Sequence, residues 1–552
     1  MEQQRNLLLI VLLCLTMFLF WNWETDKASA AKKAEEGITT SANVSEIISE
    51  SAGGKSIQLV SDNLDLMIDL NGGDIIDAKL PKILQEQGKD DPFHLLMSNK
   101  IFTYQAMSGL SGKDGIDQKS LLANKSRPTY SADKDKYELA DGEDSVSAKL
   151  TVESDGVTYS KIFTLKRNSY VVDVEYQVEN KSDRTISLNL FSQLKQTDDI
   201  SSLKDDSSFA MVASAYRGAA YSSDNSRYEK ETFSDIIDNA ESKENLNVET
   251  KTGWVAMIQH YFVSAWICNP TDNLNKVIYS NASPDKTQAI IGIKSGDTEI
   301  KAGETGSFKA QLWLGPKEQD QMGAVATNLD LTVDYGWLWF ISIPLFKILQ
   351  FIHSILGNWG FSIIVLTLIV RSCMFPLTKA QYTSMAKMRL LTPKMQELRE
   401  RYKDDRQKLG QETMRLYKSE KVNPLGGCLP MVIQMPIFIA LYWTLMESTE
   451  LRQSSFIFWI TDLSVYDPFF VLPILYGISM FMLQKMSPTP MTDPIQRKVF
   501  MAMPLVFTFM FCTFPAGLTL YWLVSNCFTI FQQTIIFRSL EKKGLSMKAA
   551  QK

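Results

Sequence analysis

One arginine, Arg371, lies inside an apolar stretch from Phe361 to Phe375 that is long enough to enter a lipid bilayer. A charged side chain at the centre of a membrane helix costs about 2.5–3.5 kcal/mol on insertion scales. Ionisable residues inside membranes are therefore rare and usually functional, which makes Arg371 the first candidate for chemistry. The cores of the neighbouring apolar segments contain no acidic residue. This favours transient attraction of acidic groups over ion-coupled transport, which usually needs a carboxylate.

Further polar residues accompany Arg371 in the apolar segments. Thr367 lies four residues before Arg371 and therefore shares its helix face. Gln434 lies in the next apolar segment, and a cluster lies in the last one. Polar groups on three helices can line a wet cavity between them. The candidate groove residues are Arg371, Thr367, Gln434, Tyr521, Trp522, Ser525 and Asn526.

Structural explanations remain open for these polar residues. Arg371 lies about a third of the way up from Lys379 at about 1.5 Å per residue, so its side chain could snorkel to the headgroups. For Gln434 and Asn526, hydrogen bonds between helices are as good an explanation as contact with a client.

Helices that span a membrane must position these residues. The second half of the chain contains five predicted spans, at 357–376, 424–446, 466–484, 499–514 and 517–537. Residues 334–354 are aromatic and amphipathic, which is typical of a helix lying in the membrane interface. Residues 1–24 contain a 17-residue apolar run that ends in Trp21 and Trp23. This favours a transmembrane anchor, although a cleaved signal peptide ending near Ala30 is the alternative.

The distribution of charge predicts which side of the membrane each segment occupies. The chain has a net charge of −5, but residues 24–333 carry −15 and residues 334–552 carry +10. Segment 377–422 contains 12 Lys and Arg, and the tail 538–552 contains five. By the positive-inside rule both belong in the cytoplasm, with the N-terminus and the loop 485–498. The acidic half and the loop 447–465 then face the periplasm of a Gram-negative inner membrane.

The acidic half has the pattern of a large antiparallel β-sandwich. Residues 25–55 are predicted to be a flexible linker, and residues 56–330 a β-domain. Tyr170 to Val178 alternate between apolar and polar side chains, and Asp155-Gly156 is a strong two-residue hairpin signal. Such sandwiches can bind or transform sugars, but no pair of histidines with a carboxylate stands out. A core without chemistry, in which His94 and His260 are ordinary sheet residues, is therefore favoured.

Segment 377–422 is predicted to form a basic hairpin of two antiparallel helices, separated at Asp404-Asp405. Its exposed methionines could hold varied apolar clients, and its cations could meet ribosomal RNA, a targeting factor or anionic lipid. The alternative is that the cations only set topology. The residues predicted to face a client or the ribosome are Met388, Met395, Arg399, Arg401, Lys403, Arg406 and Lys408.

The chain lacks the motifs of several common functions. It has three His and no CxxC pair, and only Cys268 of its six cysteines lies in the acidic half. A zinc site, a histidine-based catalytic centre and a disulfide within that half are therefore not expected. No GxxxxGK[ST] motif is present, so the chain itself should burn no nucleotide. We expect no enzyme activity, cofactor, metal or DNA partner.

Several long motifs resemble the YidC family of membrane protein insertases, in its Gram-negative form. Arg371 is followed by Phe375-Pro376-Leu377-Thr378-Lys379-Ala380-Gln381. The other matching motifs are Lys421-Val422-Asn423-Pro424-Leu425-Gly426-Gly427-Cys428, Gln434-Met435-Pro436-Ile437-Phe438, Gln484-Lys485-Met486-Ser487-Pro488 and Phe514-Pro515-Ala516-Gly517-Leu518. The motifs are dense over 334–545, and the order of parts extends the resemblance to nearly the whole chain.

The resemblance implies a multi-domain membrane protein. It would have a five-helix insertase core, an N-terminal anchor helix and a periplasmic β-supersandwich that resembles sugar-binding folds. It would insert nascent inner-membrane proteins, alone or beside the Sec translocon, through a groove open to lipid and cytoplasm but closed to the periplasm. Arg371 would be the groove arginine, with Thr367, Gln434, Tyr521 and Trp522 beside it. Expected partners include accessory subunits of the translocon, the ribosome, the signal-recognition-particle receptor and membrane lipids. The short tail after Arg538 puts stable ribosome anchoring in doubt.

Two other classes remain as alternatives. A polytopic transporter with an extracytoplasmic sugar-binding domain predicts a through-pore and a coupling carboxylate. A membrane-tethered sugar epimerase predicts a His pair with a carboxylate within 56–330. The residues of this sequence favour neither.

Overall fold

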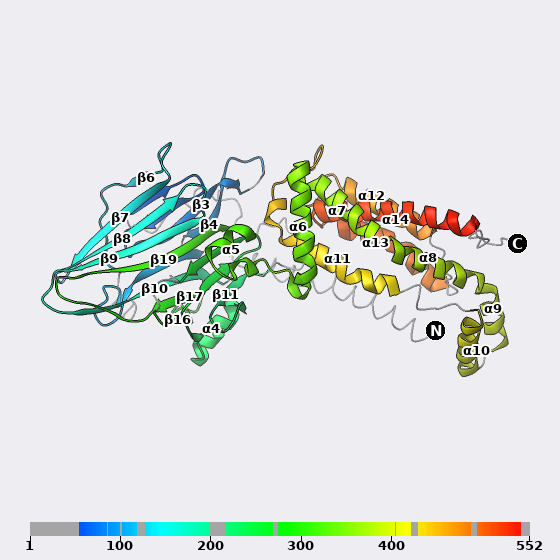
Figure 1. Cartoon of the computed structure of the whole chain (residues 1–552), viewed down its shortest axis with the longest axis horizontal. Coiled ribbons are helices and arrows are strands. Elements are labelled where there is room, and N and C mark those ends of the chain that lie inside the picture. The colour runs from blue at the N-terminus through cyan, green and yellow to red at the C-terminus, as the bar shows by residue number, and fades with distance from the viewer. Residues whose placement is uncertain are drawn as a thin grey trace, which may run out of the picture.

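The computed structural model describes residues 55–85, 87–99, 102–118, 127–198, 216–268, 274–402, 405–420, 429–486 and 494–542. The described chain forms a β-rich part followed by a helical part (Figure 1). The predicted anchor 1–24 and all but the last residue of the predicted linker 25–55 lie outside the described residues.

The hairpin expected at Asp155-Gly156 is confirmed. Strand β7 (Ser145–Ser154) pairs with β8 (Val157–Lys166), and Ser154 faces Val157 across the two-residue turn. Asp155 has φ 53° and Gly156 φ 77°, the positive values that a type I′ turn requires at both central positions. The alternation within these strands therefore turns one set of side chains towards the core.

Two sheets make up the β-domain. The larger has 11 strands. In spatial order these include β13 (Asn247–Thr250), β16 (Lys276–Ala282), β17 (Gln288–Ser295), β10 (Ile186–Thr197), β5 (Thr103–Ser111), β4 (Pro92–Ser98), β3 (Asp74–Leu84), β2 (Asp65–Asp69), β1 (Ser56–Val60) and β6 (Lys136–Glu138), with β18 (Thr298–Ile300) beside β10.

The second sheet has eight strands. Their order is β12 (Glu229–Glu231), β11 (Gly218–Ser222), β14 (Trp254–Ile258), β15 (Phe262–Ile267), β19 (Thr305–Pro316), β9 (Val171–Asn180), β8 and β7. Among the described strands, β1 and β6 pair in parallel, and the other pairings are antiparallel. The predicted antiparallel sandwich is confirmed.

Large aromatic residues are buried on both faces of the second sheet. Trp266 lies on the face towards the first sheet, whereas the strand register places Trp254 and Trp313 on the other face, and all three are fully buried. The indole N–H of Trp266 donates to the carbonyl of Gln193 on the opposite sheet at 3.0 Å. A buried indole needs such a partner, so this bond joins the sheets as well as satisfying the ring. Helix α4 (Phe233–Ser242), capped by Thr232, packs against β16 and β17 through Phe233 and Ile236.

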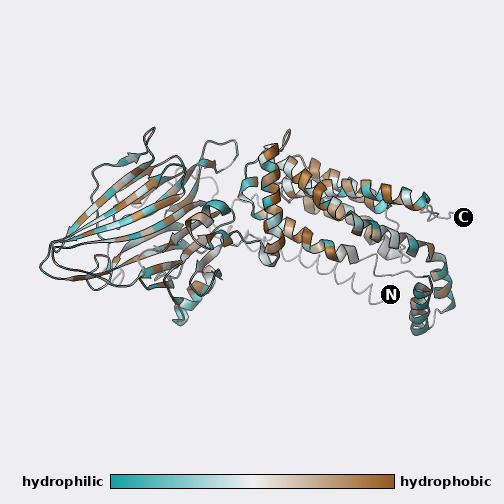
Figure 2. Cartoon of the chain, in the orientation of Figure 1, coloured by the Kyte–Doolittle hydropathy of each residue, from teal (hydrophilic) through white to brown (hydrophobic). Residues whose placement is uncertain are grey.

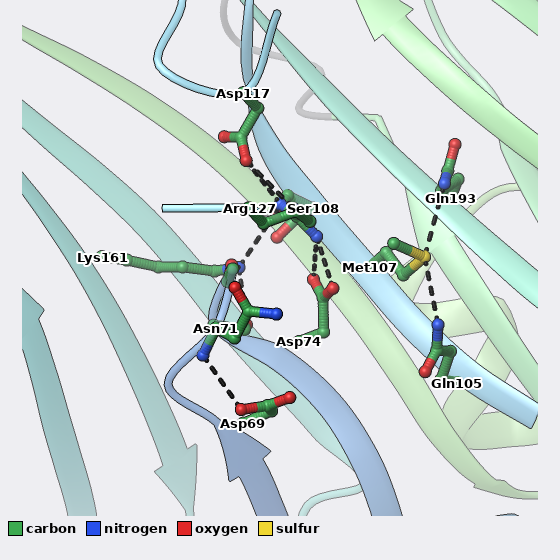
Figure 3. Close-up of polar contacts among 12 residues, drawn as sticks. Asp69, Asn71, Asp74, Gln105, Met107, Ser108, Asp117, Arg127, Lys161 and Gln193 are labelled. Atoms are coloured by element: carbon green, nitrogen blue, oxygen red, sulfur yellow. Dashed lines mark hydrogen bonds and ion pairs between the residues drawn. The ribbon is translucent and has the colours of Figure 1, made fainter. Parts of the chain in front are cut away.

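A buried ionic network also joins the two sheets, and the sequence did not predict it (Figure 3). The guanidinium of Arg127 forms salt bridges with Asp74 and Asp117, all of them nearly buried. The ammonium of Lys161, on β8 of the second sheet, donates to the carbonyls of Gly73 at 2.7 Å and Ser108 at 3.1 Å on the first. Burial lowers the pKa of Lys161 to about 7, although Asp74 opposes this. Buried charges are tolerated when they are paired and hydrogen-bonded in this way.

The helical part follows the β-domain. Helix α5 (Gln319–Val325) and the 3-10 turns η2 (Leu329–Thr332) and η3 (Gly336–Leu338) lead into it. Its helices are α6 (Trp339–Leu356), α7 (Trp359–Cys373), α8 (Phe375–Leu390), α9 (Thr392–Arg401), α10 (Arg406–Ser419), α11 (Leu429–Glu447), α12 (Val471–Met486), α13 (Pro494–Phe511) and α14 (Ala516–Lys542), with the 3-10 turn η5 (Thr449–Leu451) after α11. Figure 2 shows apolar residues along α6, α7 and α11 to α14, and mainly polar residues on α9 and α10.

Length and hydropathy alone identify fewer spans than the sequence pattern predicts. Within the described residues, Gly336–Leu356 is long and apolar enough to cross a membrane. The pair α7 and α8 passes the same test together but is bent by 58°. Shorter apolar stretches occur at Ile433–Glu447, Val471–Met486 and Phe500–Phe511. Residues 334–354, predicted to lie in the interface, form η3 and most of α6, which runs across the direction of α7 and α11 to α14 in Figure 1.

Candidate functional site: a half-buried arginine between two helices

Arg371 lies in the last turn of α7 and points towards α14. Helix α7 begins at Trp359, and the side chain of the preceding Asn358 caps it by accepting from the N–H of Phe361. The Nε of Arg371 donates to the hydroxyl of Ser525 at 2.7 Å, and a second guanidinium nitrogen donates to the same oxygen. The amide of Gln532 donates to the backbone carbonyl of Arg371 at 3.1 Å. Two side chains of α14 therefore hold the end of α7 in place.

Thr367 and Tyr521 lie on the same two helices, one turn from Arg371 and Ser525. Both are buried, with exposed fractions of 1% and 4%. The Thr367 hydroxyl donates to the carbonyl of Ile363 on its own helix at 2.6 Å, so its proton is already used. Of the seven predicted groove residues, Arg371, Thr367, Tyr521 and Ser525 thus come together on the facing surfaces of α7 and α14.

Trp522 and Asn526 project from α14 towards other helices. The Trp522 ring stacks on Phe438 of α11, with ring centroids 4.9 Å apart, and meets Phe511 of α13 at 3.9 Å. The Asn526 amide donates to the hydroxyl of Ser479 on α12 at 3.1 Å. These contacts are of the helix-joining kind that the sequence left open for Asn526.

Gln434 lies on α11 and is partly exposed. Its side-chain amide forms no hydrogen bond with another residue in the described part of the chain. One turn later, Phe438 contacts Trp522 and Tyr521 of α14, so α11 approaches the site through aromatic rings.

The electrostatic character of the site is that of an uncompensated cation. Among the described residues, no carboxylate forms a salt bridge with Arg371, and the neutral Ser525 hydroxyl is the acceptor of its guanidinium hydrogen bonds. A guanidinium has five N–H donors, so this arrangement leaves donors available for an added acceptor. A buried charge without an opposite charge is costly, which makes the site receptive to an anionic group.

An apolar cleft lies beside this site, between α7, α12 and α14. Leu368, Leu475, Phe528 and Phe531 are among its lining residues, and Ser479 is a polar member of the lining. Arg371 does not line it. The cleft offers apolar contacts within a few residues of the buried cation.

The predicted basic hairpin corresponds to α8, α9 and α10. Met388 lies on α8, which continues beyond α7, and Met395 lies on α9; both are half-buried. The exposed predicted residues are Arg399, Arg401 and Lys408. Asp405 caps α10 by accepting from the N–H of Lys408 at 3.0 Å, so this helix begins directly after Asp405. Lys403 lies outside the described residues, as does the side chain of Arg406.

Two contacts of the site were not anticipated from the sequence. Gln532, whose side chain holds the Arg371 carbonyl, was not among the residues predicted for the groove. Ser479 was missed because a serine in an apolar helix normally bonds its own backbone, so its type carries little signal. Both residues could have been found only by knowing which faces of α7, α12 and α14 meet.

Comparison with known proteins covers nearly the whole chain. Residues 56–348 match the family model described as the YidC periplasmic domain, and residues 351–543 match the model described as the 60Kd inner membrane protein. The membrane protein insertase YidC of Aeromonas hydrophila is 54% identical over all of this chain and all of its own length. That of Haemophilus influenzae is 49% identical over 99% of both chains.

A solved structure is also similar. It is the crystal structure of an active YidC insertase with its first transmembrane domain resolved. The alignment covers 88% of this chain and 93% of the chain in that structure, with 17% sequence identity and a TM-score of 0.37. The two family models and the curated relatives, which are about half identical from end to end, show that this chain belongs to the YidC family of membrane protein insertases.

Proposed function

We propose that the chain inserts nascent proteins into the inner membrane through a hydrophilic groove at the junction of α7 and α14. The observation that carries this proposal is the half-buried Arg371 side chain, bonded to Ser525 and without a carboxylate partner among the described residues. A polar client segment loses its hydration on entering hydrocarbon, at a cost of several kcal/mol per group. Arg371 lowers this cost for acidic groups, after which the apolar span partitions into lipid.

The direction of the Arg371 side chain supports a groove role over snorkelling. A snorkelling arginine extends along its helix to place the charge among headgroups. Here both bonded guanidinium nitrogens turn to Ser525 on the neighbouring helix. Tyr521 and Thr367 border the same junction, and the seven predicted groove residues remain our proposed client-facing set.

We propose the following membrane arrangement for the protein. The family is one of inner-membrane insertases, and the predicted orientation follows from charge, with the basic hairpin 377–422 and both termini in the cytoplasm and the β-domain in the periplasm. The hairpin then presents Arg399, Arg401 and Lys408 to the cytoplasm, where a ribosome or the signal-recognition-particle receptor supplies clients. The Sec translocon and its accessory subunits are proposed partners within the membrane, together with lipids. No relative supports the transporter alternative.

Substitution of Arg371 tests the proposal. We expect Arg371→Lys to retain substantial insertion, because the ammonium keeps the charge without the planar fork. Arg371→Ala should lower the insertion of a client with an acidic translocated tail by about tenfold. A tenfold change corresponds to about 1.4 kcal/mol, and the Coulomb attraction between the guanidinium and a client carboxylate in contact with it exceeds this value. Arg371→Glu should be worse for that client. The measurement is insertion per molecule of insertase, for this client and for one whose tail has been neutralised.

The control is Lys485→Ala, which removes an exposed cation at the end of α12. It should affect neither client. If Arg371→Ala at normal abundance inserts both clients equally well, the charge has no role. A reduced amount of protein with full activity per molecule would instead support snorkelling.

A further inference from the structure

The backbone carbonyl of Arg371 lies at a break between two helices. Helical hydrogen bonding is interrupted at Met374, and α7 and α8 meet there at 58°. Pro376 cannot continue the helical bonds across this break, because proline has no N–H. Arg371 is among the last four residues of α7, the positions whose carbonyls a helix leaves without a donor of its own. In a membrane segment such a carbonyl needs a partner from elsewhere in the protein.

Gln532 of α14 supplies that partner from a buried position. Its side chain is 3% exposed, and its amide nitrogen donates to the Arg371 carbonyl at 3.1 Å. Gln532 lies seven residues after Ser525, which places both residues on the same face of α14. This face therefore binds Arg371 twice, at the guanidinium through Ser525 and at the main chain through Gln532.

The rest of the Gln532 amide argues against a role in packing alone. Its oxygen Oε1 is buried and has no hydrogen-bond partner in the described part of the chain. Burying an unpartnered polar atom is unfavourable, so packing by itself favours an apolar side chain at this position. One and two turns later, the same face of α14 is occupied by the buried Ile536 and Leu540. What the amide adds over such a residue is its bond to Arg371.

Helix α8 packs on the same part of α14 just beyond the break. Tyr382 and Ala386 of α8 share a buried apolar cluster with Ile536 and Leu540 of α14. The end of α7 thus lies between two attachments to α14, the packing of α8 on one side and the Ser525 bond on the other. Gln532 holds the main chain between these attachments.

We propose that Gln532 is a positioning residue for Arg371. By holding the Arg371 carbonyl at the break, it fixes the place from which the side chain leaves α7 and so directs the guanidinium towards Ser525 and the junction with α14. An arginine side chain has many rotamers, so a fixed origin narrows where its charge can lie. This inference rests on the proposed function, because Gln532 acts here only through the charge that receives acidic client groups.

Client selectivity measures this role in the full-length chain. Gln532→Met keeps the length of the side chain but cannot donate to the Arg371 carbonyl. The readout is insertion per molecule of insertase for a client with an acidic translocated tail and for the same client with a neutralised tail. Gln532→Met should lower insertion of the acidic client about threefold and leave that of the neutralised client unchanged. The loss should be smaller than in Arg371→Ala, because the charge remains but is no longer directed.

Thr534→Val is the matched control. Thr534 lies two residues after Gln532 on α14, and its hydroxyl donates to the carbonyl of Ile530 within the same helix at 2.8 Å. Valine has nearly the same shape without the hydroxyl. This variant should therefore insert both clients as the wild-type protein does.

A double variant distinguishes positioning from general damage. If Gln532 acts through Arg371, adding Gln532→Met to Arg371→Ala should cause no further loss for either client, because the group that Gln532 positions is already absent. A further loss in the double variant, or an equal loss of both clients in Gln532→Met alone, would show a structural role and overturn the proposal.

Protein abundance is part of the same experiment. If Gln532→Met does not accumulate in the membrane, Gln532→Leu removes the same donor with a different apolar shape and is compared in its place. If neither variant accumulates while Thr534→Val does, the amide is a structural requirement and the positioning role is rejected.

The outcomes also separate this inference from the proposed function. If Arg371→Ala discriminates between the two clients but Gln532→Met inserts both as the wild-type protein does, the positioning role is wrong and the role of the groove charge stands. If Arg371→Ala inserts both clients equally well, the proposed function fails and the role of Gln532 fails with it.

Discussion

At the scale of single residues, the chain uses buried charge in three different ways. Arg127 and Lys161 are neutralised by carboxylates and carbonyls inside the β-domain. Lys317 is paired with Glu447 at the boundary between the two parts. Arg371 is the exception, because its described acceptor is a neutral hydroxyl. The charges with structural roles have hydrogen-bonded or ionic partners in the fold. Arg371 has no opposite charge among the described residues, which makes it the best candidate for a functional group.

His260 should make the contact between the β-domain and α11 sensitive to acid. Burial, together with the positive charge of Lys317, lowers the pKa of His260 to about 4, despite the hydrogen bond with Met446. Its pKa in the unfolded chain is about 6.5. Between these values only the unfolded chain binds the proton, so this contribution to stability is full above about pH 6.5 and is lost as the pH falls towards 4.

As the pH falls through this window, we expect the free energy of unfolding of the wild-type protein to decrease by up to about 3 kcal/mol relative to that of His260→Gln. The decrease is smaller to the extent that the imidazole ring is exposed to solvent. The measurement is the thermal unfolding midpoint of both full-length proteins between pH 4 and 7.5. Glu450, whose pKa burial raises to about 7, acts in the opposite direction but equally in both proteins. A difference between the two that does not vary with pH would exclude this role for His260.

At the scale of elements, the bend between α7 and α8 determines how the groove meets the cytoplasmic hairpin. Helix α8 continues from α7 after a turn of 58° and carries Met388 towards α9. Tyr382 of α8 packs edge-to-face on Phe537 of α14, with centroids 5.5 Å apart. The hairpin is therefore attached to α14, the helix that holds Arg371, as well as to α7.

Removing the hairpin should abolish insertion without dismantling the spans. We expect a chain in which 388–416 is replaced by a short Gly/Ser bridge to reach the membrane in normal amounts. Its contacts between α7 and α14 should persist, because they involve residues outside the deletion. The measurement is growth of insertase-depleted cells together with crosslinking of cysteines placed on α7 and α14. Full complementation by this variant would show that the hairpin does not receive clients.

At the scale of the whole molecule, two cores meet at a boundary that combines apolar contacts from Ile343 and Trp443 with polar junctions. The β-domain core and the helical core are separate clusters of buried residues. They are joined by Arg452, by Lys317 with Glu447, and by the salt bridge between Lys230 and Asp334. Ionic and hydrogen-bonded junctions of this kind suit a boundary at a membrane surface, where water and headgroups are near.

The orientation of the whole molecule follows from its charge and can be tested directly. We expect residues 24–333 and 447–465 to lie in the periplasm, and 377–422 and 538–552 in the cytoplasm, because the basic segments remain inside. Single cysteines in a cysteine-free background, treated with an impermeant maleimide, provide the measurement. Position 400 should react only from the cytoplasmic side, and position 184 only from the periplasmic side. Reaction of position 400 from the periplasm would invert the arrangement.

Local sequence was sufficient for the elements of the β-domain and for the family. The antiparallel strands at Trp254–Ile258 and Phe262–Ile267 belong to the predicted β-domain, because short apolar runs separated by a turn are local properties. One detail was wrong: His260 lies in the turn between these strands and faces α11, not within the sheet. The motifs around Arg371 were enough to place the chain in its family, since they are long and specific.

Contacts between distant segments were decided only by the tertiary structure. Helical spacing places Tyr521 and Ser525 on one face of α14, but it does not say that this face meets α7 while Trp522 and Asn526 face α11, α12 and α13. Likewise, nothing local pairs Lys317 with Glu447, which are 130 positions apart. Periodicity depends on neighbours within a turn or a strand, whereas the partner of a buried charge depends on how whole elements pack. The sequence by itself therefore determined the family, the strands and the candidate arginine, and the packing of helices and sheets decided what each charge touches.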